Sequence, residues 1–339
     1  MNPEILEEYT RIEKLRLRSH GSSIWKFEQI STVTHDSKSF PLWKITCGSD
    51  ESDASTLILV GGVHGLERIG SQLCISLLEK YFELSQWDVV LQNQLKQLRI
   101  VFIPMVNPIG IYRHTRSNGA GVDLMRNAPI VSTEKKTAFL IGGHQISKHL
   151  PWYMGEQPMQ PEAQFLVDTV EMEVSRSRAV ISLDIHSGFG LRDQIWFPWA
   201  FSKKPFFRLD LMQVLTDMFE SLYPHHIYKI EPQSKVYCTH GDLWDYLLHD
   251  RVKSSRFLPL TLELGSWLWV KKNPVQIFNL NGLFNPIKQH RMKRIFRRHQ
   301  LLIDFLTRFL VFMETDDFKK MDLNAYHQKG LGTWYNGNN

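Results

Sequence analysis

A histidine and a glutamate stand three residues apart in the stretch Gly61-Gly-Val-His64-Gly-Leu-Glu67. Residues with this spacing on a helical turn share one face, so the two side chains can hold one metal ion. Both also have an ordinary structural use, because a histidine can end a turn and a carboxylate stabilises the first turn of a helix. A metal site therefore requires a third ligand and a base from elsewhere in the chain.

Two further reactive side chains end apolar runs. His186 follows the run 179–185, and Glu263 ends the run 258–263. These runs, and Thr56–Val60 before His64, predict buried strands, whose carboxyl ends meet in the crevice where α/β sheets bind ligands. His186 would complete a set of three ligands suited to zinc, and Glu263 would be the general base. A satisfied structural histidine and a solvent-facing glutamate are the alternatives.

Between these stretches lies Arg116-Ser-Asn-Gly-Ala-Gly-Val-Asp123-Leu-Met125-Arg126-Asn127. Arginine forks bind carboxylates with two hydrogen bonds and can stabilise charge on a carbonyl oxygen. The run therefore suits the recognition of an acidic group, although a salt-bridged surface loop is an alternative interpretation.

In this order, the HxxE, Arg…GVDxxRN, strand-end His-Ser and strand-end Glu motifs resemble the zinc carboxypeptidases of the carboxypeptidase A type, family M14. The resemblance covers about residues 55–270 and is to a bacterial-type member without a signal peptide. It implies that His64, Glu67 and His186 bind one zinc ion. It also implies that Glu263 takes a proton from water and delivers it to the leaving amine.

The resemblance also assigns the residues of the glycine-rich run. Arg116 would stabilise the oxyanion, Arg126 would bind the substrate's terminal carboxylate, and Asp123 would orient His64 as a carboxylate behind the metal ligand. Met125 departs from the family, which usually has Asn at this position. One expected hydrogen bond to a free α-carboxylate is therefore missing.

The segment from Tyr237 to Tyr246 resembles the family's mobile tyrosine segment. Tyr237 would close over the substrate, and Trp244 and Asp245 would be further substrate-binding residues. Trp244 would lie at the base of the side-chain pocket and suggests a filled or apolar pocket. An N-acyl amino acid deacylase, resembling succinylglutamate desuccinylase and aspartoacylase, uses the same His, Glu, His and Glu set and is an alternative function.

The order of predicted elements indicates one α/β domain. Strands alternate with helices, which predicts a mixed, mostly parallel central sheet with helices on both faces, as in the zinc carboxypeptidases. We expect a zinc-hydrolase domain over residues 1–315, with its catalytic part at about 55–270. The pair Asn285-Pro286 predicts the start of a C-terminal helix over 286–313, and residues 316–339 predict a loosely ordered polar tail.

Composition limits the expected partners. The net charge of +5 is mild, and the three cysteines are unclustered, which disfavours a disulfide framework. The acidic N-terminus lacks the apolar core of a secretory signal, and no apolar run approaches the length of a membrane span. We expect a cytoplasmic protein without a membrane partner, acting on a peptide or small amide that has a free carboxylate.

The basic stretch 287–300 permits a third hypothesis. A non-catalytic protein on the same fold could use it to bind nucleic acid or another anion, but we interpret it as the solvated face of a terminal helix. Nothing in the residue pattern predicts the oligomeric state.

Overall fold

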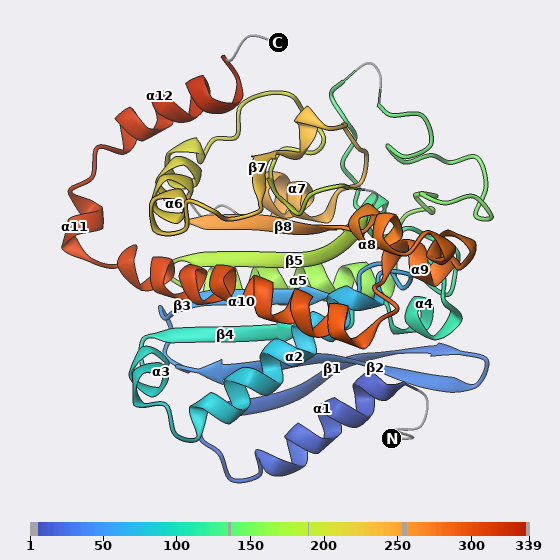
Figure 1. Cartoon of the computed structure of the whole chain (residues 1–339), viewed down its shortest axis with the longest axis horizontal. Helices are drawn as coiled ribbons and strands as arrows, with labels where there is room; N and C mark the ends of the chain where they lie inside the picture. The colour runs from blue at the N-terminus through green and yellow to red at the C-terminus, as the bar shows by residue number, and fades with distance from the viewer. Residues whose placement is uncertain (1–5, 135–136, 189, 253–255, 337–339) are drawn as a thin grey trace.

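A mixed sheet forms the centre of the molecule (Figure 1). The computed structural model describes residues 6–134, 137–188, 190–252 and 256–336, and within them the strand order is β1-β2-β4-β3-β5-β8-β6-β7. The middle strands β4, β3, β5 and β8 are parallel, and antiparallel pairs flank them. The strands are β1 (Trp25–His35), β2 (Lys38–Gly48), β3 (Ser55–Gly61), β4 (Leu98–Ile103), β5 (Val180–Gly188), β6 (Gln194–Phe197), β7 (Lys229–Pro232) and β8 (Phe257–Gly265).

Helices cover both faces of this sheet, as predicted. Figure 1 shows α2 and α10 in front of the sheet and α5 behind it. None of the helices among the described residues has the length and apolar character needed to cross a bilayer. The helices are α1 (Glu7–Arg18), α2 (Arg68–Ser85), α3 (Val89–Gln94), α4 (Pro108–Arg113), α5 (Pro161–Ser175), α6 (Leu209–Leu222), α7 (Leu243–Tyr246), α8 (Trp267–Lys272), α9 (Leu280–Phe284), α10 (Gln289–Phe312), α11 (Asp316–Lys319) and α12 (Leu323–Trp334).

The central strands are apolar on both faces because helices cover both. Every residue of β3 and β4 is buried, and Leu57 to Val60 are inaccessible to solvent. A strand in this position has no polar side, so it reads as a continuous apolar run. The short strands β6 and β7 are not predicted by the sequence, because four residues are too few to establish an apolar pattern.

Asn285 corrects one prediction. The Asn-Pro pair predicts the start of the last helix, but α10 begins at Gln289. The side chain of Asn285 instead accepts a hydrogen bond from Ile69 N at 2.8 Å and donates one to Leu66 O at 2.7 Å. Ile69 is in the first turn of α2, and Leu66 immediately precedes its N-cap residue, Glu67, whose side chain makes no capping hydrogen bond. Asn285 therefore caps a helix more than 200 residues earlier in the chain.

The predicted polar tail is also wrong for the described residues after 315, because α11 and α12 form there. Trp334 is buried, its ring centroid lies 4.9 Å from that of Phe197, and its Nε1 donates to Ile230 O at 3.0 Å. The helix α12 also packs along α6. Apolar residues of the tail thus cover the β6–β7 edge, which the mixed composition of the tail concealed. Residues 337–339 lie outside the described part.

We predict that Trp334→Ala lowers the free energy of unfolding by about 3 kcal/mol, because it leaves a cavity against β6 and removes the hydrogen bond to Ile230. Chemical denaturation followed by circular dichroism measures the change. Gln328→Ala, an exposed position on the same helix, is the control and should change stability little. Equal stability of both variants would show that α12 is not docked.

Candidate metal and catalytic centre

Three predicted ligands converge at the carboxyl ends of β3 and β5. His64 and Glu67 lie between β3 and α2, and His186 lies near the end of β5, the parallel neighbour of β3. One ligand atom from each side chain lies within 4.8 Å of the other two, and all three residues are buried. Imidazole and carboxylate donors gathered in this way are the ligand set that zinc prefers.

A close helix–strand contact brings Glu67 to His186. A Cβ atom at Gly70 would lie 2.2 Å from Ile185 O, so only glycine allows α2 to approach β5 this closely. Glu67 Oε2 accepts a hydrogen bond from Ser187 N at 3.0 Å and lies 3.1 Å from His186 Nδ1. The carboxylate of Glu67 is thus fixed beside the histidine.

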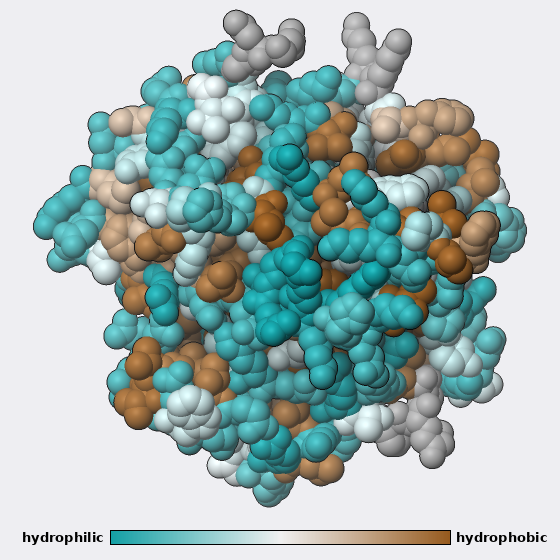
Figure 2. Space-filling view, in the orientation of Figure 1, coloured by the Kyte–Doolittle hydropathy of each residue, from teal (hydrophilic) through white to brown (hydrophobic). Residues whose placement is uncertain are grey.

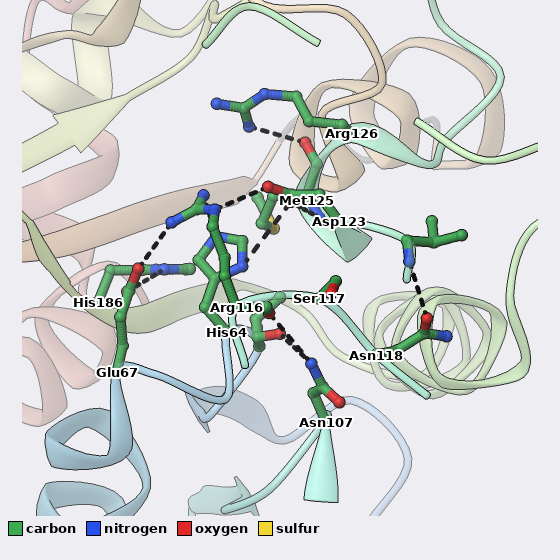
Figure 3. A network of polar contacts seen from close by, with 12 residues as sticks. His64, Glu67, Asn107, Arg116, Ser117, Asn118, Asp123, Met125, Arg126 and His186 are labelled. Carbon is green, nitrogen blue, oxygen red and sulfur yellow. Dashed lines mark hydrogen bonds and ion pairs between the residues drawn. The ribbon is translucent and has the colours of Figure 1, made fainter. Parts of the chain in front are cut away.

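Arg116 holds the other side of the ligand cluster (Figure 3). Its Nη1 donates to Glu67 Oε1 at 2.9 Å, its Nε donates to Asp123 Oδ2 at 2.8 Å, and its Nη2 lies 2.7 Å from His64 Nε2. Because a guanidinium can only donate, His64 Nε2 accepts this hydrogen bond. In the neutral ring the proton is then on Nδ1, which lies 3.7 Å from Asp123 Oδ1 and has no other partner among the described residues.

The buried charges of this cluster set its protonation. Burial and the charge of Arg116 lower the pKa of His64, so the ring is neutral and offers a lone pair. Burial opposes the charge of Glu67, but the neighbouring His186 and Arg116 favour it and lower the pKa of Glu67 to about 2. Burial also opposes the charge of His186, but Asp184 and Glu67 outweigh it and raise the pKa of His186. Without a metal, His186 is therefore protonated, and this proton competes with a metal ion for the ring nitrogen.

Asp184 lies behind His186 and was not singled out from the sequence. Its Oδ2 lies 2.8 Å from His186 Nε2 and accepts a hydrogen bond from Trp244 Nε1 at 3.0 Å. Carboxylates that pair with the second nitrogen of a ligating histidine fix its orientation. The signal was present, because residues 184 and 186 point to the same face of a strand.

The structure gives Trp244 and Asp245 buried positions. The Trp244 indole contacts Asp184 and lines a hollow of about 10 Å³ with Trp196 and Asp242. Asp245 is buried, and its Oδ2 accepts hydrogen bonds from Ala200 N and Phe201 N at 2.8 and 2.7 Å. Asp245 thus accepts hydrogen bonds from two backbone amides, and Trp244 donates one to the carboxylate of Asp184.

Glu263 is next to His186 across the β5–β8 ladder. A Cβ atom at Gly188 would lie 2.1 Å from Glu263 Oε1, so the carboxylate lies directly against the Gly188 backbone. Burial and the charge of Glu67 raise the pKa of Glu263 to about 8. A cation held by the three ligands would favour the ionised form and lower this pKa.

Arg126 and Tyr237 lie near the ligand cluster, on segments that connect the strands. Arg126 is buried, with Nε donating to Ile141 O and Nη1 donating to Met125 O, both at 3.0 Å. Burial raises the pKa of Tyr237, whereas the nearby positive charge of Arg126 opposes this rise. Met125 contributes its carbonyl to Arg126, and its buried side chain packs in the hydrophobic core.

Asn107 is a second residue that sequence reasoning missed, since Asn-Pro there predicts only a turn. It is fully buried, and its Nδ2 donates to Val63 O and Arg116 O, both at 3.3 Å. Its Oδ1 accepts from Gly110 N at 2.8 Å, which caps α4. Asn107 thus joins the backbone before His64 to the backbone of Arg116.

Comparisons with known proteins agree with this geometry. A family model described as zinc carboxypeptidase, Peptidase M14, matches residues 17–258. No curated protein matches the chain in sequence. The fold resembles that of thrombin-activatable fibrinolysis inhibitor, with a TM-score of 0.67, 18% identity, and 91% of this chain and 73% of that chain covered.

Two further solved structures share the fold. The bovine thrombin-activatable fibrinolysis inhibitor in complex with tick carboxypeptidase inhibitor has a TM-score of 0.66, 18% identity, and 91% and 96% of the two chains covered. Carboxypeptidase A from Helicoverpa armigera has a TM-score of 0.55 and 16% identity, with 74% of this chain and 62% of that chain covered. Since the family model matches most of its length, the chain belongs to the zinc carboxypeptidase family.

Proposed function

We propose that the protein is a zinc-dependent hydrolase that cuts a peptide bond next to a substrate's terminal carboxylate, as a metallocarboxypeptidase does. The convergence of His64, Glu67 and His186 carries this proposal. Glu263 lies across the ladder from His186, where a base is needed. Membership of the zinc carboxypeptidase family supports the same reaction.

One zinc ion is the proposed cofactor. The donors fit it, because His64 is neutral, Glu67 is ionised and His186 becomes a ligand when it loses its proton. When bound, such an ion polarises a carbonyl oxygen and lowers the pKa of water.

Glu263 is the proposed proton carrier, and Arg116 the proposed stabiliser of the oxyanion. The ionised carboxylate of Glu263 takes a proton from the attacking water and later donates it to the leaving nitrogen. The Nε of Arg116 stays anchored on Asp123. Its two Nη groups can then turn to the substrate oxygen once His64 and Glu67 serve as ligands, because these two side chains are their present partners.

Arg126 and Tyr237 are the proposed carboxylate-binding residues. Two of the Arg126 nitrogens bind backbone carbonyls, and its side chain also hydrogen-bonds Tyr237, so the two proposed carboxylate-binding groups lie together. Met125 adds no side-chain donor, so the contact is weaker than that of the usual Asn-Arg pair.

Met125, which adds no side-chain donor beside Arg126, favours a second candidate, the hydrolysis of small N-acyl amino acids by the same metal ligands and base. A library of peptides, muropeptides and N-acyl amino acids, incubated with the zinc-loaded protein and read by mass spectrometry, distinguishes the two. Release of C-terminal residues from peptides supports the first candidate. Turnover of N-acyl amino acids alone supports the second.

We predict that Glu263→Gln abolishes hydrolysis and leaves zinc bound, because the amide cannot accept the proton and does not ligate the ion. Turnover assays and elemental analysis measure the two quantities. Glu156→Gln, which removes an exposed carboxylate, is the control. Wild-type turnover in Glu263→Gln would refute the base assignment.

His64→Ala should lose both zinc and activity, because two ligands remain where a stable site needs three. His249→Ala, an exposed histidine, should lose neither. Full zinc occupancy of His64→Ala by elemental analysis would disprove the proposed ligand set.

Zinc binding at neutral pH should release between one and two protons, because the raised pKa of His186 keeps it protonated in the metal-free protein and the cation also lowers the pKa of Glu263 from about 8. Below that pKa the proton competes with zinc, so the apparent affinity should rise as pH rises through it. Calorimetry in buffers of different ionisation enthalpy counts the protons. A binding heat that is the same in all buffers would contradict the prediction.

Asn285→Ala should weaken zinc binding several-fold and destabilise the fold by about 1 kcal/mol, because it uncaps the first turn of α2 beside Glu67. Zinc titration against a competing chelator gives the affinity. Asn281→Ala, on the neighbouring turn, is the control. Unchanged zinc affinity in Asn285→Ala would mean that the cap does not position Glu67.

A further inference from the structure

The positive charge of the protein is concentrated immediately after Glu263. From Leu264 to Ile303 the chain has eight Lys and Arg and no Asp or Glu. The rest of the chain has 32 Lys and Arg against 35 Asp and Glu, a net charge of −3. This stretch forms α8, α9 and the first part of α10, and Figure 2 shows strongly hydrophilic side chains at the centre of the face that α10 occupies in Figure 1.

Two adjoining hollows run along this charged face, with volumes of about 440 and 170 Å³. Both are lined by Leu268 and Arg298, and we call them together the basic groove. The cationic or basic side chains that line it are those of Arg192, His226, Lys229, Lys272, His290, Arg291, Arg294 and Arg298. Asp193 is the one carboxylate among its described lining residues.

Most of this charge is not neutralised. Asp193 is committed, because its Oδ1 accepts from Gly265 N at 3.0 Å and its Oδ2 lies 3.2 Å from Arg298 Nη1. Lys229 pairs with Glu231 at 2.8 Å. Within the residues that the structure describes, no ion pair holds the remaining arginines and lysine, which are Arg192, Lys272, Arg291 and Arg294. Arg291 donates instead to the carbonyls of Trp269 and Lys272.

The basic groove begins at the loops that follow β5 and β8, the strand that carries the candidate base Glu263. Ser266 N donates to Gly188 O at 2.8 Å and Trp267 N donates to Gly190 O at 3.2 Å, so the loops after β8 and β5 are joined. Gly188, just before the loop that follows β5, lies against Glu263. Leu268, just after the loop that follows β8, lines the groove. Leu268 follows Glu263 by five residues in the chain, so the groove begins next to the end of the strand that carries Glu263.

The lining indicates a peptide more than other anions. Leu191, Ile227 and Leu268 give the groove aliphatic contacts between the cations. Single-stranded nucleic acid is held by exposed aromatic rings, but the aromatic residues of this lining, Tyr228 and Trp269, are buried. A bilayer presents a flat surface and leaves a hollow unfilled.

We propose that the basic groove binds an acidic stretch of the polypeptide substrate, with aliphatic side chains between its carboxylates, upstream of the bond at Glu263. This inference rests on the proposed peptidase function for the direction of the chain. Binding itself does not require catalysis, so the two can be tested apart.

The binding test uses a fluorescent peptide of alternating Glu and Leu, the zinc-loaded full chain and fluorescence anisotropy. The double variant Arg192→Glu with Arg294→Glu should weaken binding about tenfold or more, because both reversed charges face the peptide. The matched control is Lys293→Glu with Arg297→Glu. It changes the net charge equally on exposed residues of α10 that do not line the groove, and should change the affinity about twofold or less.

The kinetic test compares peptides that end alike but carry upstream Glu or Gln. In the wild type the acidic peptide should have the lower KM, and the groove variant should remove that difference while kcat stays the same. If no peptide is cleaved but the anisotropy result holds, the proposed function fails and the groove stands as an acidic-peptide site. If neutral peptides are cleaved and both double variants bind the acidic peptide equally, the groove proposal fails.

Two competing ligands complete the test. Single-stranded DNA of matched charge and phosphatidylserine-containing vesicles should each bind more weakly than the peptide, with no difference between the groove variant and its control. Tighter binding of either one, lost selectively in the groove variant, would overturn the assignment to an acidic peptide.

Discussion

The site depends on a buried carboxylate whose charge is balanced from three sides. Glu67 receives hydrogen bonds from Arg116 and from the backbone of Ser187, and lies beside protonated His186. An isolated ionised carboxylate in this position would be expensive to bury, and these partners offset the cost. Because they come from separate segments, the charge of Glu67 requires β3, β5 and the glycine-rich run to be in place together.

The position of Glu67 also explains why the backbone amides of the first turn of α2 are capped by a distant residue. A residue that serves as a ligand cannot also turn back to cap its own helix, and Glu67 does not. The cap comes from Asn285, and the adjacent Phe284 carbonyl accepts a hydrogen bond from Ser187 Oγ at 2.7 Å. One turn of α9 therefore braces both the HxxE turn and the end of β5.

Much of this arrangement was predictable from the residue pattern. The continuous apolar runs identified β3, β5 and β8, and the polar residues at their ends identified His64, Glu67, His186 and Glu263. Asn107, Asp184 and Asn285 were not predicted in their roles, because their partners are brought close only by the tertiary fold. Trp334 was missed because its apolar contacts lie on β6 and α6, in another part of the chain. Local pattern predicts which residues face a core, but not which distant backbone groups they satisfy.

The position of Asn285 also affects when the site can form. The family model matches residues up to 258, yet the turn that carries Glu67 is completed by residues 284 and 285. During synthesis the His, Glu and His side chains leave the ribosome long before their brace does. A nascent chain that stops after β8 would have His64, Glu67, His186 and Glu263, but not the cap that fixes the turn carrying Glu67. The geometry of the candidate site is therefore completed only after residue 285 has been made, well after its own side chains.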